Sequence, residues 1–168
     1  MRCCPNQVGQ TGAMLETVDQ IELSERQRPA HALPGEVAAA LRALAFATSD
    51  NAAEDAYHRV LYAVGNDHAG SYFPIVLDAV SFLGEILAAG TRRARARTLD
   101  VLIDLVGSFG PDPDVAPVDH TRPEDLPEAL RARVESLRPI LEQLRADPSA
   151  PDVQSLARDL LECLAHKG

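Results

Sequence analysis

The chain has 168 residues, of which 46% are hydrophobic and only 4% aromatic, with no tryptophan. This length fits one domain with a buried core, and the hydrophobic content is too high for a wholly disordered chain. Sixteen Lys and Arg residues against 25 Asp and Glu residues give a net charge of -9. This charge argues against a protein that binds nucleic acid over its whole surface, because phosphate neutralisation requires the opposite sign.

The sequence contains no signal for a membrane, a secretion route or a disulfide framework. No stretch reaches the roughly 20 apolar residues of a membrane span, and the first twelve residues lack the apolar core of a secretion signal. Cys3 and Cys4 are adjacent, Cys163 is far away, and none has partners at zinc-ligand spacing. We therefore expect a cytoplasmic protein without membrane contact.

Residues 1–33 show no sustained periodicity and contain several prolines and glycines and the mixed-charge run IELSERQR. This composition predicts a flexible N-terminal arm, with a short helical piece around residues 14–25. Residues 34–168 form the predicted helical domain.

The first predicted hairpin of that domain extends from Pro34 to about Val64. Pro34 is expected in the first helical turn, and the triplet Ser49-Asp50-Asn51 predicts a turn with an N-cap for the second helix. Residues 65–70 are rich in glycine, but they follow a helix and lack the GK[ST] signature of a phosphate-binding loop. We interpret them as a connection.

Residues 71–109 predict a second hairpin, in which apolar residues recur at i, i+3, i+4 and i+7 in both helices. Ser71 is expected to cap its first helix, with Pro74 in the first turn. Gly90 is expected to end that helix in the left-handed conformation, and Thr91 to cap the next helix. So short a joint predicts two antiparallel helices.

The Pro- and Asp-rich stretch 110–123 predicts a solvated loop, since it fails the spacing of a calcium-binding EF-hand. The next helix is expected to start at Thr121 or Arg122 and to be kinked or split by Pro139. Residues 147–149 predict a turn, and the final helix is expected from about Asp152.

The last two predicted helices look like a degenerate copy of the second hairpin, with Glu85 over Glu142 and Leu87 over Leu144. Repeated helical hairpins that share one core are typical of an α-solenoid. The run Leu144-Arg145-Ala146-Asp147-Pro148, followed by the apolar positions from Val153 to Leu164, resembles HEAT repeats. The segment from His68 to Tyr72 leading into Pro74 is also similar to HEAT-like proteins of bacterial genomes.

The resemblance covers about residues 35–166 and implies an all-α fold: a short right-handed α-solenoid of about six helices, arranged as three HEAT-like hairpins. The Pro-rich loop and Pro139 depart from the HEAT pattern. The resemblance implies a non-enzymatic protein–protein interaction module of scaffold, regulatory or immunity type.

The residues themselves indicate no reaction. The sequence lacks the G-x-S-x-G and H-E-x-x-H signatures, and its five histidines are scattered. Glu54 with His58 and Glu162 with His166 lie one helical turn apart, and we interpret both as ordinary surface pairs. We therefore predict no catalytic residue, no metal ligand and no cofactor.

The most concentrated charge is the group Arg92, Arg93, Arg95 and Arg97, at the start of a helix where the macrodipole favours acids. A solvated face is the simplest interpretation, while an acidic partner or a bond to the Asp-rich loop are alternatives. We select these four residues as the candidate partner-binding site.

Two further functions stay open. The first is a nucleic-acid-binding or DNA-repair-type HEAT-like enzyme, which the charge and the scarcity of aromatic rings disfavour. The second is a self-associating helical protein that forms a homodimer through its exposed end.

Overall fold

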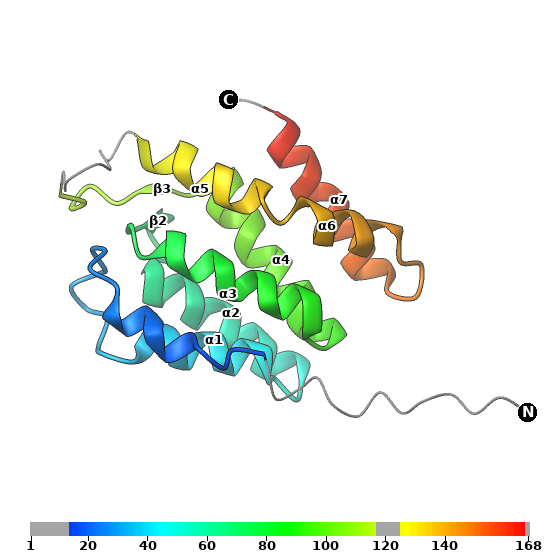
Figure 1. Cartoon of the computed structure of the whole chain (residues 1–168), viewed down its shortest axis with the longest axis horizontal. Coiled ribbons are helices and arrows are strands. Elements are labelled where there is room, and N and C mark those ends of the chain that lie inside the picture. Colours follow the sequence, from blue (N-terminus) through cyan, green and yellow to red (C-terminus); the bar gives the residue numbers. More distant parts are fainter. Residues whose placement is uncertain (1–13, 117–124, 167–168) are drawn as a thin grey trace, which may run out of the picture.

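The computed structural model describes residues 14–116 and 125–166, and it is mostly helical (Figure 1). The helices are the 3-10 helix η1 (Val18–Leu23) and the α-helices α1 (Glu36–Ala45), α2 (Asp50–Val64), α3 (Val76–Ala89), α4 (Arg92–Gly107), α5 (Leu126–Glu135), α6 (Arg138–Ala146) and α7 (Pro151–Ala165). Three two-residue strands are present: β1 (Gly65–Asn66), β2 (Ser71–Tyr72) and β3 (Gly110–Pro111). The predominance of helix confirms the expected all-α class.

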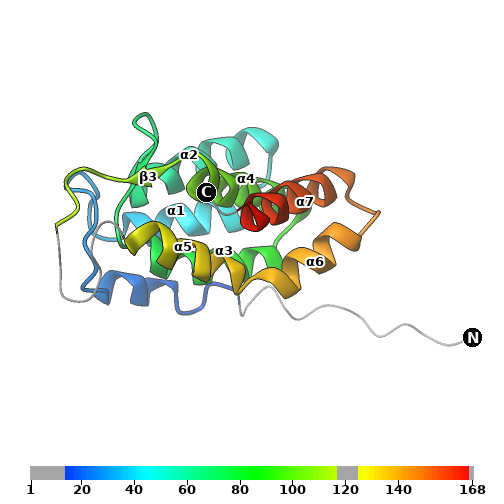
Figure 2. The ribbon, with the colours of Figure 1, turned by 90° about the horizontal axis from the view of Figure 1, so that it is seen from above.

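The α-helices are arranged in two layers, which Figure 2 shows from above. In one layer α4 lies between α2 and α7 and contacts both. In the other layer α3 lies between α1 on one side and α5 and α6 on the other. Contacts between α1 and α2, α3 and α4, and α6 and α7 join the layers. The hydrophobic core fills the space between them.

Helix α4 contacts helices of both layers. Leu99, Val101 and Leu102 are fully buried, and Leu105 is almost so. The one buried hydroxyl on this helix, at Thr98, donates a 2.7 Å hydrogen bond to the carbonyl oxygen of Ala94. This bond satisfies a polar group that would otherwise destabilise the core.

Two predicted N-caps are confirmed. The Ser49 hydroxyl accepts a hydrogen bond from the backbone N–H of Ala52 at 3.1 Å, and the Thr91 hydroxyl accepts one from Ala94 at 3.3 Å. The first helix, however, begins at Glu36 rather than in a turn containing Pro34, and the residue that precedes it, Gly35, has a left-handed φ of 82°.

The predictions for Ser71 and Gly90 are wrong. Ser71 lies in β2, and its hydroxyl donates a 2.5 Å hydrogen bond to Asp112, while α3 begins only at Val76. Gly90 has φ −72° and ψ 167°, which is extended rather than left-handed. Glycine is needed there for space, because a Cβ atom would lie 2.5 Å from the carbonyl oxygen of Ile86.

The connection between α2 and α3 contains a small sheet. Strand β1 pairs antiparallel with β2, and β2 pairs parallel with β3, so the segment after α4 joins the loop after α2. A Cβ atom on Gly65 would lie 1.9 Å from the carbonyl oxygen of Ser71, so only glycine permits this pairing.

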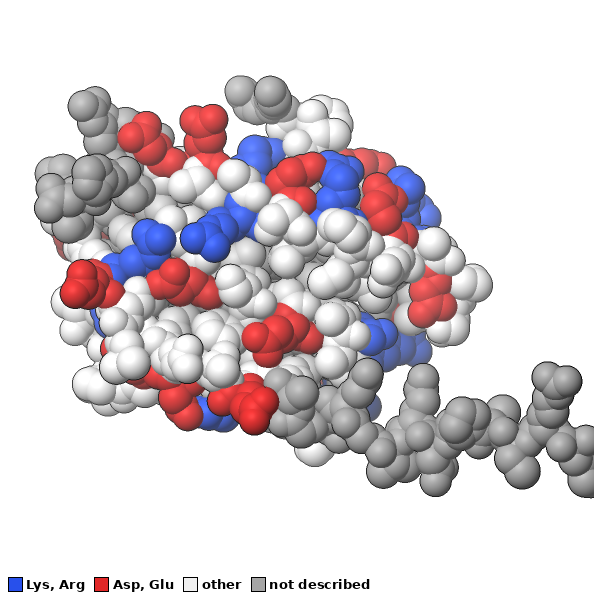
Figure 3. Space-filling model, viewed as in Figure 1, with Lys and Arg blue, Asp and Glu red and all other residues white. Residues whose placement is uncertain are grey.

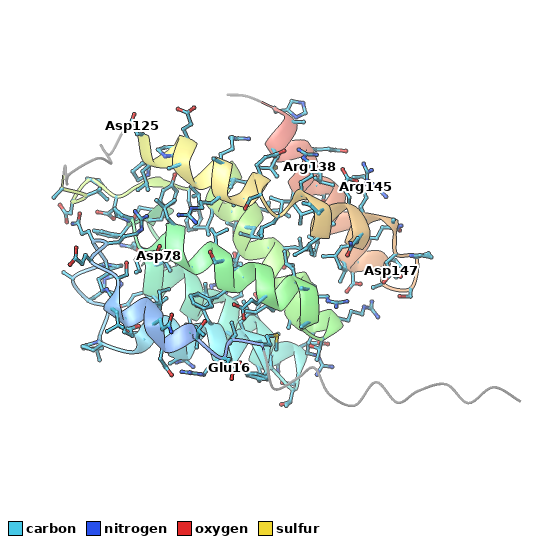
Figure 4. All side chains as sticks on the ribbon, viewed as in Figure 1. Glu16, Asp78, Asp125, Arg138, Arg145 and Asp147 are labelled. Carbon is cyan, nitrogen blue, oxygen red and sulfur yellow. The ribbon has the colours of Figure 1, made fainter. Side chains whose placement is uncertain are left out.

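Residues 14–33, the second part of the expected arm, lie against α1 and α3. The expected helical piece is present as η1, and Val18 and Ile21 are buried in the core cluster. Asp78 of α3, labelled in Figure 4, accepts hydrogen bonds from Ser24 at 2.5 Å and Arg26 at 3.0 Å. Residues 1–13 of the expected arm lie outside the described residues.

The C-terminal predictions also fit in large part. Proline at position 139 lies in the first turn of α6, and the chain is divided there into α5 and α6, as expected. Asp147 accepts hydrogen bonds from the backbone N–H and the hydroxyl of Ser149 at 2.9 and 2.6 Å, which forms the predicted turn before α7. The expected helix start at Thr121 or Arg122 lies outside the described residues, as do residues 117–123 of the Pro- and Asp-rich loop.

The cause of the glycine requirement at position 90 can be tested. We expect Gly90→Ala and Gly90→Asn both to lower the free energy of unfolding by about 1–3 kcal/mol, the usual cost of overpacking. Urea unfolding followed by circular dichroism measures this, with Gly110→Ala as the control because a Cβ atom there meets nothing within 4 Å. A left-handed Gly90 would instead leave Gly90→Asn close to wild type.

Candidate interaction groove

A groove of about 710 Å³ opens where α2, α4 and α7 begin. We call it the charged groove. It is lined by Asp50, Ala53, Thr91, Arg92, Arg93, Ala96, Arg97, Asp100, Asp152 and Leu156. The three helices belong to one layer and start at the same end of it, so their first turns meet at this groove.

Arginines of the central helix α4 bond to both of its neighbours in the charged groove. Arg92 Nε lies 2.8 Å from Asp152 Oδ1 on α7, and Arg93 Nε lies 3.2 Å from Asp50 Oδ1 on α2. Arg97 bonds to Glu54 of α2 as well as to Asp100 of its own helix. Each arginine therefore has an acidic partner within the chain.

The structure brings together three of the four arginines selected from the sequence. Arg92, Arg93 and Arg97 line the charged groove, whereas Arg95 is not part of its lining and donates a 2.8 Å hydrogen bond to the carbonyl oxygen of Ala88. No ion pair joins these arginines to the described part of the Asp-rich loop, residues 110–116.

These ion pairs are exposed, which limits their contribution to stability. The Arg92 side chain is 62% exposed and that of Asp50 is 88% exposed. Exposed pairs contribute about 0–1 kcal/mol each, because water screens them and the side chains lose conformational freedom. The charges of the groove are therefore accessible to a ligand at small cost to the fold.

The carboxylates that face the arginines could not be predicted as their partners from the sequence. Those of Asp50, Glu54 and Asp152 come from α2 and α7, about 40 to 60 residues away along the chain. Asp100 and Asp104 lie on α4 itself, one turn apart, and Tyr57 of α2 donates its hydroxyl hydrogen to Asp104. The i, i+4 spacing of Asp100 and Asp104 was the one local sequence pattern that indicated two carboxylates on the same side of α4.

Burial raises the pKa of the Tyr57 hydroxyl, and the adjacent Asp104 carboxylate raises it further. Tyr57 is therefore protonated throughout the physiological range and acts as a donor. This bond joins α2 to α4 one turn beyond the charged groove.

Folding shifts the pKa values of Asp100 and Asp152 in opposite directions. Burial raises the pKa of Asp100 and outweighs the opposing effect of the bond to Arg97, and the Asp104 and Glu54 carboxylates add smaller increases. Burial also acts to raise the pKa of Asp152, but the bond to Arg92 and backbone N–H groups hold it below its ordinary value. Ionised Asp100 thus opposes folding, while ionised Asp152 favours it.

The lining of the groove is balanced, with three carboxylates and three guanidiniums. Two further carboxylates at its border, Glu54 bonded to Arg97 and Asp104 bonded to Tyr57, bring the total to five carboxylates and an excess of two negative charges. The carboxylates belong to Asp50, Glu54, Asp100, Asp104 and Asp152, and the guanidiniums to Arg92, Arg93 and Arg97. On the opposite layer, Figure 3 shows acidic and basic side chains intermixed. There Arg138 and Arg145 of α6, labelled in Figure 4, both pair with Glu142.

Of the two histidine–carboxylate pairs expected from the sequence, the structure contains only the pair of His58 with Glu54. His58 Nε2 lies 3.6 Å from Glu54, as expected, and its Nδ1 lies 2.6 Å from Asp67. His166, by contrast, bonds to the backbone carbonyl of Glu162, so the expected side-chain pair is wrong. Within residues 14–116 and 125–166, no three His, Cys, Asp or Glu side chains are placed to hold a metal ion.

None of the helices in the described ranges combines the length and apolar composition needed to cross a membrane. The chain matches no protein-family model, no curated protein and no solved structure. The HEAT-like assignment therefore stays a prediction.

The raised pKa of Asp100 predicts how the stability of the protein depends on pH. Because its folded pKa is raised, the ionised carboxylate is destabilising above that folded pKa, and the effect vanishes once pH falls below the ordinary value of an aspartate. We expect Asp100→Asn to raise the melting temperature at pH 7, with the gain disappearing as pH falls below about 4. A melting temperature lowered at pH 7 would contradict this, and Glu128→Gln on the exposed surface of α5 is the control.

Proposed function

We propose that this chain is a short right-handed α-solenoid of about three HEAT-like hairpins that acts as a non-enzymatic protein–protein interaction module. The row α2, α4, α7 and the row α1, α3, α5–α6 support the solenoid, because neighbours within each row contact one another. Stacked hairpins in which each contacts only its neighbours are typical of such repeats. A scaffold, regulatory or immunity-type protein fits this description.

The charged groove is the observation that carries the proposal. Its walls bear exposed charges of both signs, and the half-buried Ala96 and Leu156 supply apolar surface between them. An apolar centre within a polar rim is the usual composition of a protein interface.

The excess of carboxylates indicates the chemistry of the partner. Four of the five acids bond to arginines, with Arg97 shared between Glu54 and Asp100, and Asp104 accepts a hydrogen bond from Tyr57. Five carboxylates against three guanidiniums still leave a local surplus of negative charge around Asp100 and Asp104. A lysine or arginine side chain of a partner would relieve this surplus and lower the cost of ionised Asp100. We infer that the groove binds a basic segment of another protein.

The same features weigh against a nucleic-acid-processing enzyme. Binding to single-stranded nucleic acid relies on a positively charged groove and on aromatic side chains that stack on bases. The residues that line the charged groove include three arginines but no aromatic ring, and the nearby carboxylates outnumber the arginines. Phosphate groups would be repelled by the surplus.

Site-specific photocrosslinking in the cells that produce the protein tests the proposal. A photoreactive residue at position 156 lies in the groove, and one at Gln143 on the exposed surface of α6 is the control. We expect one protein to be captured from position 156 and not from position 143. Mass spectrometry should locate the crosslink within a Lys- or Arg-rich segment.

Two charge-reversal variants distinguish specific recognition by the groove from incidental contact. We expect Asp100→Lys to abolish the crosslink, because it replaces the surplus negative charge by a positive one. Glu128→Lys makes the same change on α5 and should leave the crosslink intact. Capture of nucleic acid, or a crosslink that Asp100→Lys leaves unchanged, would overturn the proposed function.

A further inference from the structure

The two ends of the helical row differ in the polarity of their outer surfaces. At the C-terminal end, α6 and α7 present polar and charged residues to solvent, including Gln143, Arg145, Arg158, Asp159 and Glu162. At the N-terminal end, α1 presents Ala39, the half-buried Ala43 and Phe46, which is 50% exposed. Stacked repeats need a polar outer face on their terminal units to remain soluble, and the N-terminal end departs from this by its apolar residues on α1.

The apolar residues of α1 form one stripe. Ala39, Ala43 and Phe46 are spaced at i, i+4 and i+7, which places them on one side of the helix. The buried residues of α1 occupy the other side, toward α2 and α3. The 3-10 helix η1 also contacts α1, and Arg42 bonds there to Asp19 at 2.7 Å, but Ala39 and Phe46 remain exposed.

A second stripe of exposed residues follows α2, the partner of α1 in this hairpin. Asp55, Arg59 and Tyr62 repeat the i, i+4, i+7 spacing, and Tyr62 is 44% exposed. Because α1 packs on α3 and α2 packs on α4, both stripes lie on the side of the hairpin away from the rest of the row. We call this surface, formed by residues 39, 43, 46, 55, 59 and 62, the end face.

The end face is complementary to itself. Asp55 and Arg59 are one turn apart and have no ion pair among the residues that the structure describes. A two-fold axis crossing α2 between them would place each Asp55 opposite the Arg59 of the second copy. Such an isologous contact uses the same patch on both subunits and is the commonest form of oligomer.

Net charge also favours this face for a second copy. Two chains that each carry a charge of -9 repel one another, so they approach most easily through surfaces of balanced charge. The end face has one acid and one base, whereas the charged groove and its border have a surplus of acids that suits a basic partner and repels another copy. We propose that the chain forms a two-fold homodimer through the end face, leaving the charged groove free.

Sedimentation equilibrium across a wide range of concentration tests this proposal. We expect a species of twice the 18.1 kDa chain mass that dissociates on dilution. Ala43→Glu introduces a charge at the centre of the stripe, and glutamate is a good helix former, so the fold should be retained. We expect it to raise the dissociation constant about a hundredfold or more, because it buries an unpaired charge among the apolar residues of the contact.

Charge exchange tests the two-fold arrangement, with circular dichroism confirming that each variant is folded. Asp55→Arg alone and Arg59→Asp alone should each weaken the dimer, and the double variant should restore it, because the pairs reform with reversed sign. Gln143→Glu at the polar end is the control and should leave the dimer unchanged. A monomer at all concentrations, a dimer insensitive to Ala43→Glu, or a double variant that stays weak would each overturn the proposal.

Discussion

The packing of α4 against helices of both layers is the constraint on which the rest of the structure depends. Its apolar residues contact helices of both layers, and this fixes where α2, α3 and α7 lie. The side of α4 that remains open carries Arg93, Ala96, Arg97 and Asp100. The charged groove therefore lies on the polar side of the central helix, and its neighbours α2 and α7 supply the remaining walls.

Packing energies and charge energies differ in size here, and the difference separates structure from function. Full burial of one leucine such as Leu102 contributes about 1.5–3 kcal/mol, whereas an exposed ion pair contributes about 0–1 kcal/mol. The core thus determines the fold, while the groove charges are free to serve recognition. Asp100 is consistent with this division, since its ionised form opposes folding and yet faces the groove.

Local sequence patterns predicted what local forces determine. The 3.6-residue stripes located the helices, the hydroxyls of Ser49 and Thr91 identified two caps, and Pro139 marked the break between α5 and α6. The predictions failed where distant segments meet: Ser71 bonds to Asp112 and pairs with β3, which no local pattern encodes. The site follows the same rule, because the arginines form a visible cluster while their acidic partners come from other helices.

A double-mutant cycle on Arg92 and Asp152 measures most directly whether the groove charges serve recognition rather than stability. Urea unfolding of the wild type, Arg92→Ala, Asp152→Ala and the double variant isolates the coupling across their 2.8 Å contact. We expect a coupling energy below about 1 kcal/mol, as for other exposed pairs. A coupling above about 2 kcal/mol, in the range of interactions that hold a structure together, would contradict the view that these charges are available to a partner.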